Sequence, residues 1–420
     1  MDLLVKATAN KFKKTGATKK VSLPGQMENQ YPVYSIPLSE LFYNNQNGRI
    51  NTSYKQYQAE KGALTPKPGN SEYNRVFQKL VYDSNPQALK DTLDSIKQKT
   101  QQEPGVVLPD GRVIDGNRRF TALRMIQNQD KIAQSFETII LPLDSETDEK
   151  TIKELELDLQ LGREERVNYD PIDRIFDVYN TIKVTKLMTV EEYKKASGAG
   201  NSKGINRDIR LAELILRFIG IVSPGGNPVD KFYLARELKL DGPVEEIEST
   251  LSKMEDSDKE SIIDAVLVNL AVSKVGDGSR DSTRVMRDLK TNVLKNPEQL
   301  SHYLDAVDDK VDIVVDEFRA NPVKSASDLK LVLNKPEMKP EIAKFQASTG
   351  KLIRKGKNDS KRKKALVKLQ EIRDSLDDLH AEDFKELTIE ENFEAKDVLS
   401  EITDILYKLK NDLKNEGGKR

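Results

Sequence analysis

The segment that most constrains the fold of this chain is residues 104–126, PGVVLPDGRVIDGNRRFTALRMI. Its pattern predicts a short strand, a Pro-Asp-Gly turn, a second strand over residues 112–114, and then an amphipathic helix. Strands and helices alternate around it, and residues 138–143, TIILPL, predict a further buried strand. We therefore expect a small α/β domain that closes near residue 145.

The same segment carries a candidate anion site. Where a strand ends in a glycine and a helix begins, backbone N–H groups and the positive end of the helix dipole meet. Gly116, Asn117, Arg118 and Arg119 stand at that point, so we expect them to receive a phosphate. In the alternative interpretation, Asp115 caps the helix, Gly116 relieves the turn and the arginines are solvated surface charges. The spacing alone does not separate the two interpretations.

A second candidate ligand for an anion is Arg49. Residues 31–41, YPVYSIPLSEL, predict a strand and a short helical turn, and they lead into residues 44–50, NNQNGRI. The Asn47-Gly48 pair is a turn sequence that would present Arg49 from a loop. The alternative is an exposed loop arginine that is simply solvated.

Composition excludes several classes of site. The chain has 420 residues, 68 of them basic and 69 acidic, with no cysteine and with His302 and His380 as its two histidines. It therefore has no disulfide, thiolate metal site or cysteine nucleophile, and we expect no metal centre. The net charge of -1 means that any nucleic-acid surface is a local patch. No apolar run approaches the ~20 residues of a membrane span, so we expect a cytoplasmic protein without a membrane partner.

The length predicts two or three domains, and the composition along the chain suggests how they are arranged. The expected division is a flexible arm over residues 1–30, the α/β domain over 31–150 with a polar insertion at 51–86, a helical linker and helix-turn-helix over 151–222, a helical domain over 223–345, and a basic linker with a helical hairpin over 346–420. The predicted fold class is α+β, a small α/β domain followed by a mostly α-helical chain.

The insertion is rich in tyrosine, asparagine, glutamine and lysine. Tyr54, Tyr57, Tyr73 and Tyr82 interleave with basic residues, a pattern that can stack on nucleic-acid bases. Tyrosines in a polar insertion are more often local packing anchors, and this alternative stays open. A helix over residues 87–99 is expected to follow, because its apolar positions recur at helical spacing.

A charged break interrupts the helices after residue 161, in the sequence GREERVNYDP. Arg166 lies in it and is a further candidate ligand for an anion. Mixed charges at a helix junction usually form salt bridges on the surface, although they can also grip a nucleotide or a metal. Asp170-Pro171 starts the next helix.

Residues 187–220 fit a helix-turn-helix. The pattern is a helix capped by Thr189, a glycine-bearing turn, and a second helix that starts near Ser202. In that geometry five polar and basic side chains would face the DNA major groove or its flanking phosphates: Ser202, Lys203, Asn206, Arg207 and Arg210. The alternative is an ordinary helical hairpin with a polar outer face.

Two basic segments follow. Residues 279–294 form a basic helix on which Arg280, Arg284, Arg287 and Lys290 could lie along one side. Residues 351–364, KLIRKGKNDSKRKK, carry eight basic residues and one acidic residue and suit either a phosphate-neutralising segment or a solvated linker. Beyond them, leucine and isoleucine recur every three or four residues over 365–413, as in two helices of a hairpin that can self-associate.

The order of these segments resembles the ParB-like group of DNA-binding proteins, which have a ParB/sulfiredoxin-type N-terminal domain followed by a helix-turn-helix. The resemblance covers roughly residues 31–220, and DGRVIDGNRRFTALR is its most specific part. It implies that Gly116, Arg118 and Arg119 bind nucleotide phosphates, with CTP and Mg²⁺ as the expected cofactor. It also implies that the helix-turn-helix reads DNA and that the C-terminal helices form a homodimer.

The chain departs from this family in two places. Members that hydrolyse CTP use a Glu-Asn-x-x-Arg segment, and residues 162–166, GREER, keep only the final arginine. The insertion at 51–86 is more similar to phage- or defence-associated relatives than to chromosomal partition proteins. The sulfiredoxin side of the superfamily needs a catalytic cysteine, which this chain lacks.

We therefore expect a ParB-like DNA-binding protein that binds nucleotide phosphates and acts in DNA partition, regulation, or phage or defence biology. Two alternatives stay open, a nuclease or nucleotide hydrolase and a non-catalytic helical scaffold. No compact Asp/Glu/Lys constellation stands out in favour of DNA cleavage, so the sequence assigns no catalytic residue.

Overall fold

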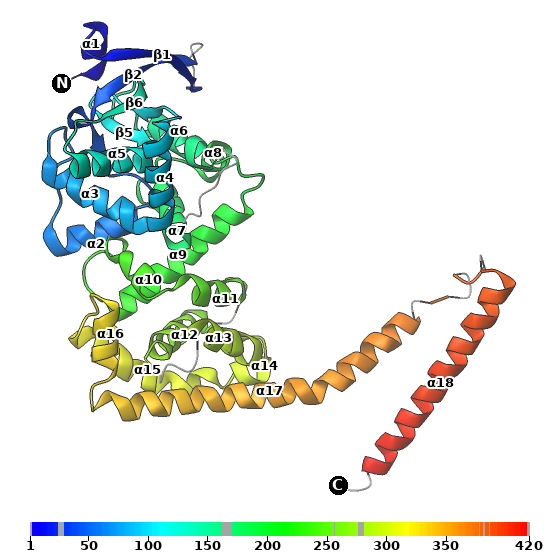
Figure 1. The fold of residues 1–420 in the computed structure, drawn as a ribbon. Coiled ribbons are helices and arrows are strands. Elements are labelled where there is room, and N and C mark those ends of the chain that lie inside the picture. The colour runs from blue at the N-terminus through cyan, green and yellow to red at the C-terminus, as the bar shows by residue number, and fades with distance from the viewer. Residues whose placement is uncertain are drawn as a thin grey trace. The chain divides into compact units, whose positions relative to one another are not determined.

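The computed structural model describes residues 2–23, 29–161, 170–255, 257–275, 281–377, 379–380, 383–385 and 387–417. The chain divides into two units, Met1–Ile353 and Arg354–Arg420. The first unit holds a six-stranded sheet and, following it in the chain, a set of packed helices (Figure 1). The predicted α+β class is confirmed.

The sheet is mixed, with the strand order β1-β2-β6-β4-β5-β3. Neighbours pair antiparallel except for β3 with β5 and β4 with β6, which are parallel. The strands are β1 (Lys13–Lys20), β2 (Gln30–Pro37), β3 (Phe42–Tyr43), β4 (Gly105–Val107), β5 (Arg112–Asp115) and β6 (Ser135–Ile140). The strand-turn-strand-helix predicted from residue 104 onward is confirmed, and β6 begins three residues before the predicted strand.

Side chains alternate between two cores on the two faces of the sheet. Val107 and Val113 pack on one face with Phe77 and Phe120, whereas Ile114 packs on the other face with residues of α6. This alternation is what strands covered on both faces require. The helices of this part are α1 (Leu3–Thr8), α2 (Asn51–Lys61), α3 (Ser71–Ser84), α4 (Pro86–Lys99), α5 (Asn117–Asp130) and α6 (Glu149–Leu161), with the short turn η1 (Leu38–Glu40).

The N-terminal segment is not the flexible arm that the sequence predicted. Leu3, Ala7 and Phe12 are buried in the sheet core, and β1 pairs antiparallel with β2 at the edge of the sheet. The prediction failed because β1 is polar and lacks an alternating apolar pattern: its stability comes from the backbone ladder rather than from its own side chains.

The tyrosines of the insertion divide into two groups. Tyr54 and Tyr73 are buried among aromatic neighbours, with the ring centroids of Tyr73 and Phe77 4.4 Å apart. The Tyr73 hydroxyl donates a hydrogen bond to the Tyr43 carbonyl (2.8 Å). These two side chains are therefore packing anchors, and Tyr82 is exposed.

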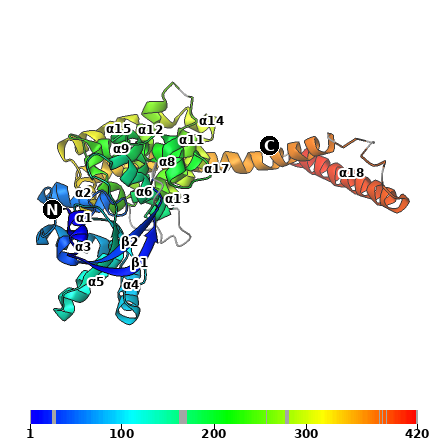
Figure 2. The ribbon, with the colours of Figure 1, turned by 90° about the horizontal axis from the view of Figure 1, so that it is seen from above.

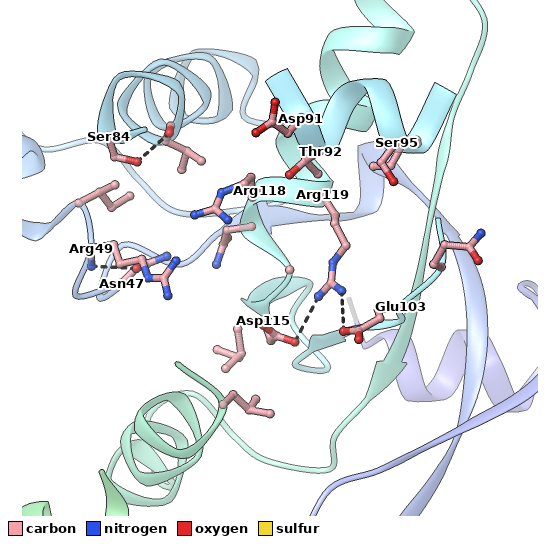
Figure 3. Close-up of a pocket in the computed structure, with 18 of the residues that line it drawn as sticks. Asn47, Arg49, Ser84, Asp91, Thr92, Ser95, Glu103, Asp115, Arg118 and Arg119 are labelled. Atoms are coloured by element: carbon pink, nitrogen blue, oxygen red, sulfur yellow. Dashed lines mark hydrogen bonds and ion pairs between the residues drawn. The ribbon is translucent and has the colours of Figure 1, made fainter. Parts of the chain in front are cut away.

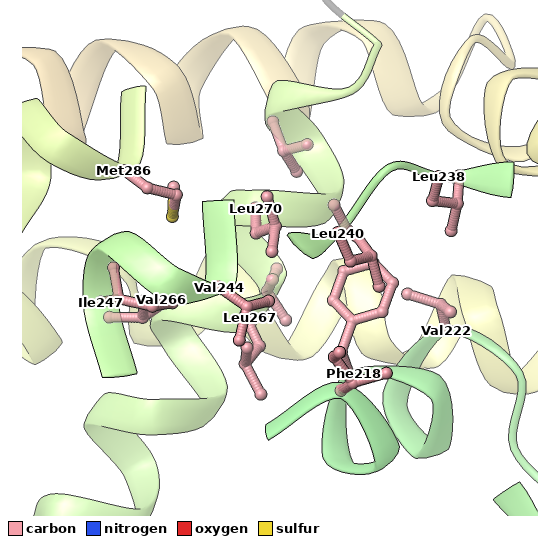
Figure 4. Close-up of a cluster of buried hydrophobic side chains, with 14 of the residues drawn as sticks. Phe218, Val222, Leu238, Leu240, Val244, Ile247, Val266, Leu267, Leu270 and Met286 are labelled. Atoms are coloured by element: carbon pink, nitrogen blue, oxygen red, sulfur yellow. The ribbon is translucent and has the colours of Figure 1, made fainter. Parts of the chain in front are cut away.

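The helical part of the first unit shares one large core, shown in Figure 4. Leu211 and Phe218 of α9 lie in it together with Val244 of α11 and Val266 of α12. The domain boundary expected at residue 222 is therefore wrong, because α9 is amphipathic along its whole length and its apolar face is covered by the helices that follow. The helices are α7 (Pro171–Tyr179), α8 (Val190–Ala196), α9 (Lys203–Val222), α10 (Tyr233–Glu237), α11 (Asp241–Leu251), α12 (Lys259–Ser273), α13 (Ser282–Leu289), α14 (Pro297–Leu300), α15 (Tyr303–Ala320) and α16 (Ala326–Leu333), with η2 (Asn180–Val184), η3 (Pro228–Lys231) and η4 (Lys290–Leu294).

Two long helices end the chain, α17 (Met338–Asp377) and α18 (Ile389–Gly417). The basic segment at residues 351–364 is part of α17, so the linker predicted there is wrong. Lysine and arginine are good helix formers. The helix also continues through Ser348, Thr349 and Gly350, because Phe345 and Leu352 on either side of them are buried in the helical core. Within the described part of the chain, no helix is long and apolar enough to cross a membrane.

Candidate functional site

A pocket of about 570 Å³ lies at the N-terminus of α5 (Figure 3). It is bordered by the loop before α2, the C-terminal end of α3, one face of α4 and the turn between β5 and α5. Five of the six candidate anion ligands named from the sequence line it: Arg49, Gly116, Asn117, Arg118 and Arg119. The sixth, Arg166, lies outside the described residues.

Gly116 shapes the turn from β5 into α5. Its φ of 92° is left-handed, and it occupies the N-cap position of α5 without any side-chain cap. A Cβ atom added there would lie 2.9 Å from the ring of Phe136 and 3.0 Å from the Arg119 guanidinium. Only glycine fits both restrictions easily, so the first amides of α5 are left open toward the pocket.

The alternative in which Asp115 caps the helix is wrong. Its carboxylate instead pairs with Arg119 (3.4 Å) and with Lys19 of β1 (3.1 Å). Arg119 also pairs with Glu103 at 3.2 Å, as the dashed lines in Figure 3 show. Arg119 is therefore held by two carboxylates and forms one wall of the pocket.

Arg118 is in a different electrostatic environment. No hydrogen bond or ion pair to another described residue involves its side chain, which is half-buried. Burial, together with the positive charges of Arg49 and Arg119, lowers the pKa of Arg118. The guanidinium stays charged, but it lies where a second cation repels it and where a bound anion would relieve the repulsion.

Asn117 supplies a hydrogen-bond acceptor in the same place. Its Oδ1 is buried, and no donor within the described chain reaches it. Buried amide oxygens normally have a partner. The atom is therefore available to a ligand's N–H or O–H group.

Residues of α4 form the opposite wall of the pocket. The sequence analysis predicted this segment as an amphipathic helix and named no binding residue in it. Asp91, Thr92 and Ser95 line the pocket. Ser95 follows Asp91 by four positions and Thr92 by three, so its side chain lies beside both on the helix surface. The spacing of these polar residues was therefore a usable signal. The wall gives the pocket hydroxyl and carboxylate groups across from its arginines.

The loop that presents Arg49 is hydrogen-bonded to a residue of α6. Asn47 Oδ1 accepts a hydrogen bond from the Arg49 backbone N–H (3.0 Å), which forms the predicted turn. The backbone N–H of Gly48 donates to the buried carboxylate of Glu156, whose pKa is raised by burial. Lys153 pairs with Glu156 at 3.5 Å and with Asp177 of α7 at 2.6 Å, so a buried charge network fixes this wall of the pocket.

The five predicted helix-turn-helix residues lie on α9 and at its N-cap position, and none of them lines the pocket. Thr189 forms a capping box with Glu192 at the start of α8, as the sequence predicted for the cap. Lys203, Asn206, Arg207 and Arg210 of α9 all lie on an exposed face, and Ser202 precedes them at the N-cap position.

Two of these five candidates are already bound within the chain. Arg207 pairs with Glu245 (3.5 Å) and Arg210 pairs with Glu248, both on α11. The Glu248 side chain is 3% exposed, so Arg210 neutralises a buried carboxylate. The sequence did not predict this contact, because the paired residues are 38 positions apart.

The first of the two basic segments predicted further along the chain is also ion-paired. On α13 and η4, Arg287 and Lys290 both pair with Glu246 of α11, whereas Arg280 lies outside the described residues. In the described ranges, no group of three or more histidine, aspartate or glutamate side chains is arranged to hold a metal ion.

Comparison with known proteins gives a weak similarity to a solved structure. No family model matches the chain, and no curated protein matches it. A solved structure of a Pnob8-like ParB-N domain is similar over 67% of this chain and 97% of that chain, with a TM-score of 0.30 and 12% sequence identity. This is a weak resemblance at the level of the fold, and it carries no argument about what this chain binds.

Proposed function

We propose that the pocket at the N-terminus of α5 binds the phosphates of a nucleotide and that the chain is a ParB-like DNA-binding protein. One observation carries the first part. Arg118 has no described partner and is repelled by Arg49 and Arg119 beside the open amides of α5. An arginine without a described counter-charge, at a helix N-terminus, is suited to a phosphate group.

Each side chain has a distinct part in this proposal. Arg118 donates to the phosphate oxygens, with Arg49 from the opposite side and the α5 amides behind them. Asn117 Oδ1 accepts from the nucleotide, and Asp91 and Thr92 of α4 contact its sugar or base. A volume of about 570 Å³ accommodates a ligand of nucleotide size. CTP with Mg²⁺ is the ligand that the sequence resemblance implies.

The test is calorimetric titration of CTP, ATP and pyrophosphate, each with Mg²⁺, into the wild-type chain and the Arg118→Gln variant. We expect the variant to bind at least about tenfold more weakly, because each charge-assisted hydrogen bond contributes roughly 1.5–3 kcal/mol. The matched control is Arg75→Gln, which removes an exposed arginine from α3 outside the pocket. No binding of any of the three ligands to the wild type would refute the proposal.

The second part, DNA binding, is favoured by a specific feature of α9. Lys203 and Asn206 lie exposed on its first turns, and no ion pair to a described residue holds Lys203. Asparagine and lysine at the start of a second helix can reach base edges and phosphates. We infer that these two residues, with Ser202, read DNA, and that Arg207 and Arg210 contribute only if they leave their partners on α11.

The test measures affinity for genomic duplex fragments by fluorescence anisotropy. We expect Lys203→Ala with Asn206→Ala to reduce the preference among fragments, while Lys195→Ala on α8 leaves the preference unchanged. If the preference survives the double substitution, α9 does not read DNA.

The biological setting follows from the resemblance alone. We propose a role in DNA partition, regulation, or phage or defence biology, with a second copy of the chain as a partner through its C-terminal helices. The residues that would correspond to the hydrolytic segment lie outside the described part of the chain, so the proposal is confined to binding.

A further inference from the structure

The outermost strand of the sheet carries lysines that have no acidic partner. β1 is bonded to β2 on one side only and forms the edge of the sheet, at the top of Figure 1 and along the front of the first unit in Figure 2. Four exposed lysines lie on it or just before it: Lys11, Lys13, Lys14 and Lys20. Among the described residues, no carboxylate lies within ion-pair distance of any of them.

The two other lysines of this segment provide the contrast. Lys6 pairs with Glu40, and Lys19 turns inward to Asp115 and to the Pro104 carbonyl. Those two lysines stabilise the folded structure through ion pairs. The four exposed lysines do not, except that Lys14 lies 6.0 Å from the centre of the Tyr34 ring.

Neither β1 nor β2 carries a negative charge. Residues 3–23 and 29–39 contain no aspartate or glutamate, with Asp2 and Glu28 as the acidic residues that precede and separate them, and the whole chain has a net charge of -1. Positive charge is therefore concentrated on this edge, where it is not cancelled as it is on α9 and α13. An uncancelled cluster of this kind attracts a polyanion.

The spacing of the lysines suits a nucleic-acid backbone. At about 3.4 Å per residue, Lys13 to Lys20 span roughly 24 Å, close to the length of seven base pairs. The register of β1 with β2 shifts between Lys14 and Thr18, and Gly16 has a φ of 87° within this irregularity. Such a shift increases the local twist of a strand pair.

We propose that the β1 edge is a sequence-independent contact surface for the sugar–phosphate backbone of duplex DNA. Flexible ammonium groups without neighbouring amide side chains neutralise phosphates but do not read bases. This inference rests on the DNA-binding part of the proposed function and is independent of the nucleotide pocket. In this proposal the edge of the sheet, rather than the ion-paired arginines of α9, makes the main electrostatic contact with DNA.

One other role for these lysines is to keep the edge strand from pairing with a second copy of the chain. The two roles predict different behaviour when the charges are removed. A DNA surface loses affinity for DNA, whereas a protected edge becomes free to self-associate.

The test uses the full chain with Lys11→Gln, Lys13→Gln, Lys14→Gln and Lys20→Gln together. Affinity for a random-sequence 20-base-pair duplex is measured over a series of salt concentrations. We expect the slope of log affinity against log salt to fall by about 2 to 4 and affinity at low salt to drop at least about tenfold. The preference among genomic fragments is expected to stay unchanged.

The matched control removes the same charge from exposed helix and loop positions of the same part of the chain: Lys67→Gln, Lys90→Gln, Lys99→Gln and Lys131→Gln. Replacing the four β1 lysines with arginine is expected to restore the slope. Thermal unfolding of each variant verifies that the sheet is intact.

Three results would overturn the inference. The first is an equal loss of slope in the two glutamine variants, which would indicate a net-charge effect. The second is an unchanged slope together with oligomers of the β1 variant, which would indicate edge protection. The third is wild-type chain that binds no duplex at low salt. That result also removes the DNA-binding proposal, whereas either of the first two leaves α9 as a DNA-binding element.

Discussion

Gly116 is the single residue on which the geometry of the pocket most depends. Its φ of 92° and the 2.9 Å approach of the Phe136 ring leave no room for a side chain. We predict that Gly116→Ala lowers the free energy of unfolding by about 1–3 kcal/mol, because the backbone strain and the clash add. It should also weaken phosphate binding, because the amides at the start of α5 shift. Urea denaturation and nucleotide titration measure the two effects.

Gly220 in α9 provides the control. A Cβ atom there meets nothing within 4 Å, so Gly220→Ala should raise the free energy of unfolding by about 0.5–1 kcal/mol through helix propensity. If both substitutions changed stability in the same direction, the strain assigned to Gly116 would be contradicted.

Asp173 of α7 is a buried acid between the sheet part and the helical part of the first unit. Its carboxylate accepts hydrogen bonds from Thr52 of α2 and Arg236 of α10. Burial raises the pKa of Asp173 to about 7, although the Arg236 guanidinium opposes the shift.

The raised pKa predicts how stability depends on pH. Between about pH 4 and pH 7 the folded state holds a proton that the unfolded state releases, so the stability contributed by Asp173 is complete below pH 4 and is lost as the pH rises through about 7. The loss is at most about 4 kcal/mol. In urea denaturation at a series of pH values, Asp173→Asn should flatten this part of the curve. A curve of unchanged shape would mean that Asp173 titrates normally.

The contact between α9 and α11 leads to a prediction about elements. Arg210 neutralises Glu248, which is almost fully buried, while Arg210 itself is 44% exposed. We predict that Arg210→Ala lowers the free energy of unfolding by about 1–2 kcal/mol, because an unpaired buried carboxylate remains. Adding Glu248→Gln should recover part of the loss. Chemical denaturation of the single and double variants measures the coupling between them.

Lys203→Ala, on the same helix, is the reference for this experiment and should leave stability within about 0.5 kcal/mol of the wild type. A result in which Arg210→Ala is equally neutral would show that the ion pair contributes nothing. A loss of DNA binding in Arg210→Ala can therefore be assigned to a lost DNA contact only if the stability of the variant is measured as well.

The sequence predicted α8 and α9 well, because the signals for both helices are local. The capping pair Thr189 and Glu192, the glycine turn and the apolar periodicity of α9 all lie within a few residues of one another, so the helices could be read from the sequence. The contact of α9 with α11 could not, because residues 38 positions apart come together only through packing.

The C-terminal unit, Arg354–Arg420, leads to a prediction about the assembled protein. Its helices leave large apolar side chains exposed at spacings of three and four residues, among them Leu366, Leu369, Ile405, Leu409 and Leu413. Such a stripe is normally buried against a partner helix. We predict that the chain self-associates and that Ile405→Lys with Leu409→Lys raises the dimer dissociation constant at least about tenfold in sedimentation equilibrium.

The control for self-association is Leu331→Lys on α16, where a single leucine is 70% exposed without apolar neighbours at helical spacing in its exposed face. It should leave the dissociation constant unchanged. A wild-type chain that stays monomeric at about 100 μM would contradict the prediction.

The sequence by itself determined the α+β class, the strand-turn-strand-helix that follows residue 104, and the grouping of Gly116, Asn117, Arg118 and Arg119. These depend on glycine conformation, turn chemistry and side-chain periodicity, all of which act over a few residues. Only the tertiary structure decided which charges are free. Pairing with carboxylates distant in the chain neutralises Arg207 and Arg210, whereas Arg118, Lys13, Lys14 and Lys20 are left without a described carboxylate partner, because charge pairing depends on distance in space rather than along the chain.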